Sequence, residues 1–180
     1  MSILKVARMG HPVLRTPADP IDRGDIRNPA FQRLIDDMMD TMSEYHGVGL
    51  AAPQVHEGLR LFIVAFDPTR PDPPEDEAPE PFAIVNPEIT PVGDTMVEDW
   101  EGCLSIPDIR GRVPRFKEIL LRGQTRKGDR FELPLADFRA RVVQHESDHL
   151  DGVLFFDRMR SFTSLAFLDE YSRYWVKERD

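Results

Sequence analysis

Two histidines and a glutamate in residues 144–152 (QHESDHLDG) form the sequence's clearest chemical pattern. On a helix, His145 and His149 lie one turn apart on one face, so their imidazoles can bind the same metal ion. Glu146 lies about 100° around that helix, where it can act on a water molecule without being a ligand. The H-E-x-x-H pattern therefore predicts metal-dependent hydrolysis with its own base. A chance pattern on a surface helix and a purely structural zinc site are the alternatives.

A catalytic metal site of this type needs a third protein ligand and an open position. Metzincins have a histidine six residues after the second one, but Phe155 occupies that position here. Glu170 lies near the distance that other zinc proteases use, although its segment is expected to pack by an apolar face. We favour Cys103, the sole cysteine, which lies 42 positions before His145, so the fold must bring the two together. An inert cysteine in the core is the alternative for that residue.

Composition limits the possible functions. The 180 residues suffice for one domain spanning 1–180, and a formal charge of −9 argues against a nucleic-acid binder. One cysteine excludes an internal disulfide, which is typical of a reducing compartment. Without an evident signal peptide or apolar membrane span, we expect a cytoplasmic location and no membrane partner.

Several elements must position these residues. Asn28 and Pro29 predict the start of an apolar-faced helix that ends near Gly47. A helix from about Asp137 to Gly152 carries the histidines, and Ser161 is expected to begin a final amphipathic helix through Trp175. Strands are predicted at 59–66, 82–85, 88–92, 117–122 and 130–135. This order indicates an α+β fold in a single domain.

Two further segments complete the interpretation. Residues 67–81 hold six prolines and six acids, which predicts an exposed loop. Phe138 and Val142 precede the histidines at the same helical phase, so they are expected to form an apolar wall beside the metal.

Three separated segments together resemble the peptide deformylases. They are residues 47–54 (GVGLAAPQ), 101–105 (EGCLS) and 144–152 (QHESDHLDG), with GHPVLR near the N-terminus and VPR at 113–115 in support. The resemblance implies β-sheets packed around the central HExxH helix, with a C-terminal helix. It also implies a hydrolase of protein biosynthesis that removes the N-formyl group from N-formylmethionyl nascent peptides and releases formate.

The resemblance assigns roles to individual residues. Cys103, His145 and His149 would hold one divalent metal ion, natively Fe²⁺, with Zn²⁺, Ni²⁺ or Co²⁺ also compatible. Glu146 would be the general acid/base. The Gln54 side-chain amide and the Leu104 backbone N–H would stabilise the developing oxyanion. Gly49 would pair with the peptide main chain, and Val48, Phe138 and Val142 would surround the methionine side chain.

Other positions leave alternatives open. Arg141 replaces an aliphatic residue of some relatives and is expected at the pocket rim. Glu101 and Arg115 form either an ion pair or two solvated charges. The C-terminal residues could dock on a ribosome, but a packed helix is the preferred interpretation. A zincin-type endopeptidase using Glu170 and a catalytically silent peptide binder are the competing functions.

Overall fold

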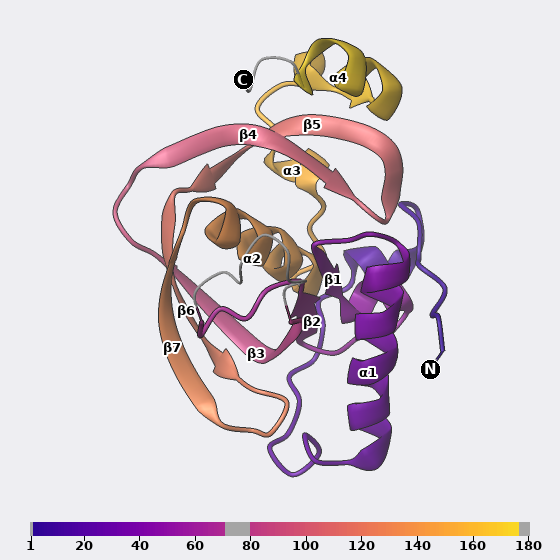
Figure 1. The fold of residues 1–180 in the computed structure, drawn as a ribbon, viewed down its shortest axis with the longest axis vertical. Coiled ribbons are helices and arrows are strands. Elements are labelled where there is room, and N and C mark those ends of the chain that lie inside the picture. The colour runs from indigo at the N-terminus through magenta and orange to yellow at the C-terminus, as the bar shows by residue number, and fades with distance from the viewer. Residues whose placement is uncertain (1, 71–79, 177–180) are drawn as a thin grey trace.

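One helix lies at the centre of the structure, and strands surround it. The computed structural model describes residues 2–70 and 80–176. Helix α2 (Asp137–Leu150) crosses the middle of the molecule, with strands curving around it (Figure 1). From Ala140 to its last residue the helix is buried, apart from a partly exposed Ser147. The predicted α+β fold, with sheets packed around the histidine-bearing helix, is confirmed.

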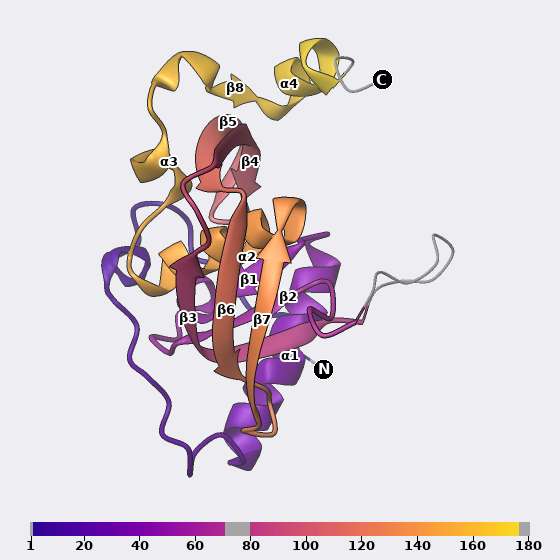
Figure 2. The same cartoon turned by 90° about the vertical axis from the view of Figure 1, so that its left-hand side faces the viewer.

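The strands form two antiparallel sheets. The larger sheet has the order β1-β2-β3-β6-β7 and the smaller one β4-β5-β8. Figure 2 shows β6 and β7 standing beside α2 while β4 and β5 arch over it. The strands are β1 (Gly49–Ala51), β2 (Leu61–Val64), β3 (Phe82–Pro91), β4 (Met96–Cys103), β5 (Ile106–Phe116), β6 (Glu118–Gln124), β7 (Arg130–Ala136) and β8 (Ala166–Phe167).

Helix α1 (Pro29–Glu44) begins where the sequence predicts. The Asn28 side chain accepts a hydrogen bond from the Ala30 N–H at 2.9 Å. Pro29 suits the first helical position because it has no N–H, and an N–H at that position would lack a partner within the helix. Its buried residues, including Met38 and Met42, pack against β2 and β3 in an apolar cluster. The helix ends at Glu44, three residues before the predicted glycine.

The strand predictions differ in detail from the structure. Residues 82–85 and 88–92 were expected as two strands but belong to the single strand β3. A register shift between Val85 and Glu88 marks the irregular point, where Asn86 has a φ of 48°. The predicted strand 59–66 is shorter, because Leu61–Val64 alone form β2.

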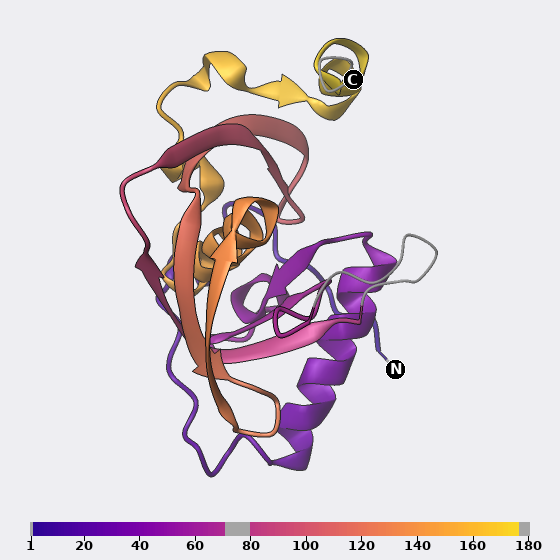
Figure 3. The same cartoon turned by 60° about the vertical axis from the view of Figure 1, so that its left-hand side comes forward.

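The C-terminal region contradicts the prediction of one long amphipathic helix. Ser161 does cap a turn by accepting from the Thr163 N–H, but that turn is the 3-10 helix Phe162–Ser164. Strand β8 follows, and then the short helix α4 (Leu168–Tyr174) lies above β4 and β5 (Figures 2 and 3). Phe167 is 67% exposed, since β8 breaks the helical phase that its spacing suggested.

The sequence also predicted an exposed loop at residues 67–81 and no membrane-spanning segment. Of the predicted 67–81 loop, residues 71–79 lie outside the described part, while 67–70 and 80–81 adopt no helix or strand. None of the helices among residues 2–70 and 80–176 combines the length and apolar character that crossing a bilayer requires.

Candidate metal centre and cleft

Cys103, His145 and His149 converge inside the protein. Helix α2 presents both histidines on one side, and Cys103 is the last residue of β4. One potential ligand atom from each lies within 4.8 Å of the others, and the Cys103 Sγ is 3.2 Å from the His149 Nε2. Among the described residues this is the group that could hold a metal ion. Glu170 lies elsewhere, on α4, with its carboxylate 3.7 Å from Arg173, so it does not serve as the third ligand.

Gln54 is fixed beside this group by its own backbone segment. It lies in the 3-10 helix Ala52–Val55, and its Oε1 accepts a hydrogen bond from the Ala51 N–H at 2.8 Å. That bond orients the amide so that Nε2 donates to the Cys103 Sγ at 3.4 Å and the Ser105 Oγ at 3.2 Å. The amide therefore faces the cysteine sulfur with little freedom to turn, since the residue is 2% exposed.

Glu146 occupies space that only a glycine leaves free. A Cβ built on Gly49 would lie 2.6 Å from the Glu146 Cδ and 2.8 Å from its Cγ, closer than real Cβ atoms come. The carboxylate therefore rests against the backbone of β1 beside His145. Gly49 has a steric role that the sequence interpretation, which gave it a substrate contact, did not include.

A cleft of about 380 Å³ opens beside the three residues. The four predicted substrate-binding residues, Val48, Gly49, Phe138 and Val142, all line it, as do Gln54, Leu104 and Glu146. The exposed fractions are 50% for Val48 and 59% for Phe138, so both offer apolar surface to the cleft. The cleft also includes residues that the sequence interpretation did not assign, among them Trp100, Arg110 and Leu168.

Comparison with known proteins agrees with this geometry. Residues 3–164 match the family described as polypeptide deformylase. The chain belongs to the polypeptide deformylase family. Peptide deformylase 2 of a Nostoc species is 44% identical over 97% of this chain and 96% of its own length. Peptide deformylase 1 of Bordetella pertussis is 44% identical, covering 91% of this chain and 92% of the relative.

Solved deformylases share the fold. A Met-Ala-Ser-bound class I type b peptide deformylase from Acinetobacter baumannii superposes with a TM-score of 0.78 at 41% identity, covering 88% of this chain and all of that one. Peptide deformylase from Thermotoga maritima gives a TM-score of 0.78 at 36% identity over 89% of this chain and 100% of its own. The protein is accordingly an enzyme, a deformylase that depends on a metal ion.

The residues of this deformylase fit a divalent metal ion. The Glu146 Oε2 beside these residues is buried without a hydrogen-bond partner, although buried polar atoms nearly always have one. Burial opposes ionisation of the thiol, but His149 and His145 outweigh it and hold the pKa of Cys103 well below its usual value. A thiolate with two imidazoles is a donor set that first-row divalent metals accept.

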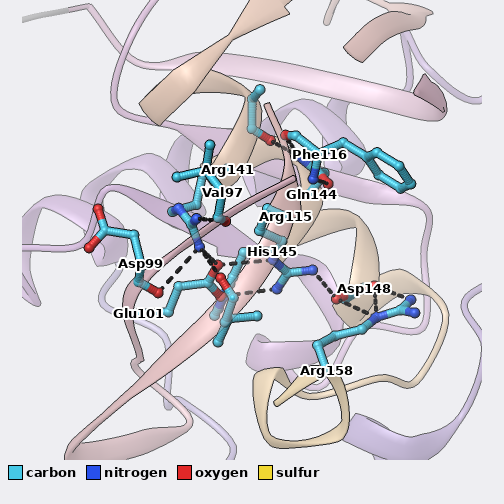
Figure 4. Close-up of polar contacts among 12 residues, drawn as sticks. Val97, Asp99, Glu101, Arg115, Phe116, Arg141, Gln144, His145, Asp148 and Arg158 are labelled. Carbon is cyan, nitrogen blue, oxygen red and sulfur yellow. Dashed lines mark hydrogen bonds and ion pairs between the residues drawn. The ribbon is translucent and has the colours of Figure 1, made fainter. Parts of the chain in front are cut away.

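Glu101 connects His145 to the framework of the deformylase. Its Oε2 lies 2.9 Å from the His145 Nδ1, and Arg115 donates to both of its oxygens at 2.9 and 3.0 Å (Figure 4). Burial opposes ionisation of this carboxyl, but His145 and Arg115 outweigh it and keep its pKa far below the usual range. Of the two interpretations left open by the sequence, the ion pair is therefore correct. A carboxylate on Nδ1 leaves Nε2 as the nitrogen free to bind metal.

Arg141 lines the cleft, where its charge suggested it would lie, but its guanidinium is bonded to protein acceptors instead of water. The residue is 9% exposed, and its Nη1 donates to the Glu101 Oε1 at 2.7 Å and to the Val113 carbonyl at 2.8 Å. Its Nη2 donates to the Val97 carbonyl at 2.7 Å (Figure 4). These acceptors from β4 and β5 satisfy the guanidinium, so it can be buried at little penalty and tie α2 to the β4–β5 hairpin.

Proposed function

We propose that this deformylase removes the formyl group from N-formylmethionyl peptides, with Cys103, His145 and His149 as the metal ligands. The observation that carries the proposal is the convergence of one sulfur and two imidazoles beside a cleft, which Cys103, His145 and the unpartnered carboxylate of Glu146 line. The natively bound ion is proposed to be Fe²⁺, as the family resemblance implies. A thiolate with two imidazoles is also compatible with Zn²⁺, Ni²⁺ or Co²⁺, so the ligand set does not choose among these metals.

When bound, the divalent ion would supply Lewis-acid chemistry, polarising the formyl oxygen and lowering the pKa of water. Glu146 would take a proton from the attacking water and return it to the leaving nitrogen. In the metal-free protein burial raises the pKa of this carboxyl to about 7, so its site favours the protonated form far more than water does. The products are formate and a peptide with a free amino group.

Gln54 would stabilise the negative charge that develops on the formyl oxygen. Its Nε2 lies beside the cysteine sulfur and donates to the Cys103 Sγ and the Ser105 Oγ, so one of these two N–H groups would turn to the formyl oxygen. The Leu104 backbone N–H, in the turn between β4 and β5, is the proposed second donor. Removing one such donor typically costs about 10²–10³ in kcat.

The peptide is proposed to lie along the cleft as an added strand. Gly49 of β1 would pair with its main chain, and Val48, Phe138 and Val142 would surround the methionine side chain. We propose that the chain acts as one catalytic domain, because elements from both sheets and α2 contribute to the same site.

The direct test is formate release from formyl-Met-Ala-Ser by the metal-loaded protein. The expected result is turnover that falls to background in Glu146→Ala with its metal content retained. Cys103→Ala should lose both metal and activity. A Cys103→Ala protein that retains metal and activity would refute the proposed ligand set. Equal formate release by wild type and Glu146→Ala would refute the proposed role of Glu146 as the base.

A further inference from the structure

Arg141 and His145 reach one carboxylate from the same face of α2. The two residues are four positions apart on the helix, so their side chains lie one turn from each other. The Arg141 Nη1 donates to the Glu101 Oε1 at 2.7 Å, and the His145 Nδ1 lies 2.9 Å from the Oε2 of the same residue (Figure 4). A single helix therefore contacts both oxygens of the carboxylate, one through the arginine and one through the histidine.

The Arg141 guanidinium is itself held by main-chain acceptors. Its Nη1 also donates to the Val113 carbonyl of β5 at 2.8 Å, and its Nη2 donates to the Val97 carbonyl of β4 at 2.7 Å. Arg141 is 9% exposed and Glu101 7%, so water has little access to these bonds. A planar guanidinium bonded to two backbone carbonyls is a fixed donor, and it restrains the carboxylate that it contacts.

Arg115 supplies the remaining contacts to this carboxylate. Its Nε donates to the Glu101 Oε1 at 2.9 Å and its Nη2 to the Oε2 at 3.0 Å. The Oε1 therefore accepts from two guanidinium groups, whereas the Oε2 is shared between Arg115 and His145. Arg141 is thus the donor that distinguishes the two oxygens and keeps the Oε2 turned toward the histidine.

We propose that Arg141 is a positioning residue for the metal centre. By holding the Glu101 Oε1 it keeps the Oε2 on the His145 Nδ1, which leaves the Nε2 of that ring for the metal. This inference rests on the proposed function, in which His145 is a ligand. Loss of the partner of a ligand histidine typically weakens metal binding about 10–100-fold, and Arg141 acts one contact further out, so we expect an effect of about tenfold.

An effect of charge alone would have the opposite sign. A buried cation repels a divalent ion, so removing the Arg141 charge would by itself strengthen metal binding. Positioning predicts the reverse, because the histidine loses its orientation when the carboxylate is free to turn. The direction of the change therefore distinguishes the two roles.

The test measures the Zn²⁺ affinity of the full-length protein by competition with a chelator. Arg141→Met keeps an unbranched chain but has no donor, and it should bind Zn²⁺ about tenfold more weakly. Arg141→Lys retains a cationic donor for the Glu101 Oε1 and should remain within about threefold of wild type. An unchanged or higher affinity in Arg141→Met would overturn the proposal.

A double-mutant cycle with Glu101→Gln separates positioning from a general loosening of the fold. An amide has one acceptor oxygen, so it cannot accept from Arg141 at one end and from His145 at the other. In that background Arg141→Met should change the Zn²⁺ affinity by less than about twofold. A full tenfold loss there would overturn the proposal, since it would come from the packing of α2 against the β4–β5 hairpin.

Arg158→Met is the matched control. Arg158 donates to Asp148 at 2.7 Å within the same group of charges but makes none of the bonds to Glu101 described above. This variant should keep the wild-type affinity within about twofold, and a loss equal to that of Arg141→Met would overturn the proposal. If Arg141→Met does not fold, Arg141→Gln takes its place and should weaken Zn²⁺ binding at least about fivefold.

Formate release from formyl-Met-Ala-Ser tests the underlying function separately. A wild-type protein that binds Zn²⁺ but releases no formate would overturn the proposed function, whatever the affinities of the variants. Equal Zn²⁺ affinities in wild type and Arg141→Met would overturn the positioning role and leave the deformylase activity standing.

Discussion

Gly49→Ala should disable this enzyme without disturbing its metal ligands. The new Cβ would lie 2.6 Å from the Glu146 Cδ, whereas ordinary contacts are 3.4–4 Å, so the carboxylate must shift by about 1 Å. A displacement of that size at a catalytic group can reduce the rate about 100-fold, or about 2.7 kcal/mol of transition-state stabilisation. We therefore expect kcat for formyl-Met-Ala-Ser to fall about 100-fold while one metal ion per chain is retained.

Two comparisons test the reasoning behind that loss. Gly47→Ala places its Cβ 3.1 Å from the flexible Leu104 Cδ1, a contact that a small side-chain shift relieves, so it should cost less than tenfold. In a Glu146→Ala background, where nothing remains to be displaced, Gly49→Ala should leave the affinity for the peptide Met-Ala-Ser almost unchanged, as measured by calorimetry. A tenfold or greater loss of affinity in that background would refute the steric account, since the damage would then lie in the backbone or substrate pairing.

Three other changes have defined outcomes. Glu101→Gln removes the charged partner of the His145 Nδ1, so the affinity for the metal should fall about 10–100-fold. Competition with a chelator measures this affinity. An unchanged affinity would show that the contact is dispensable. Gly152→Ala places a Cβ on a residue whose φ is 71°, at 2.8 Å from the Arg15 backbone. The free energy of unfolding should fall by at least about 1–2 kcal/mol, which lowers Tm by roughly 2–8 °C. An unchanged Tm in a thermal melt would contradict the proposed strain. Burial raises the pKa of Glu146 to about 7, so its carboxyl in the metal-free protein should be protonated below that pH and ionised above it. Isotope-edited infrared titration can detect this change. Bound Zn²⁺ should lower the pKa, since a nearby cation favours the carboxylate.

The sequence predicts the central helix well because one periodicity encodes both its packing and its chemistry. His145 and His149 share a face at helical spacing, and Val142 continues that face into the core. The position of Cys103 follows from no local pattern, since the β4–β5 hairpin brings it to the histidines on α2. The family resemblance provided that link, and the distances among the three residues agree with it.

Long-range pairing explains what the sequence could not predict. The last apolar segment has helical spacing, yet β8 pairs with β5 and interrupts it after Leu165, leaving Phe167 on the surface. Arg141 lines the cleft as its charge suggested, but the sequence did not reveal that the Val97 and Val113 carbonyls and the Glu101 carboxylate surround its guanidinium. Both features depend on hydrogen-bond partners from distant strands, and spacing along one segment does not reveal those partners.

The most direct test of the metal centre is X-ray absorption at the metal edge of the zinc-loaded protein. The account predicts one sulfur at about 2.3 Å and two imidazole nitrogens at about 2.0–2.1 Å, with the sulfur lost in Cys103→Ser. A first shell of nitrogen and oxygen alone in the wild-type protein would contradict it.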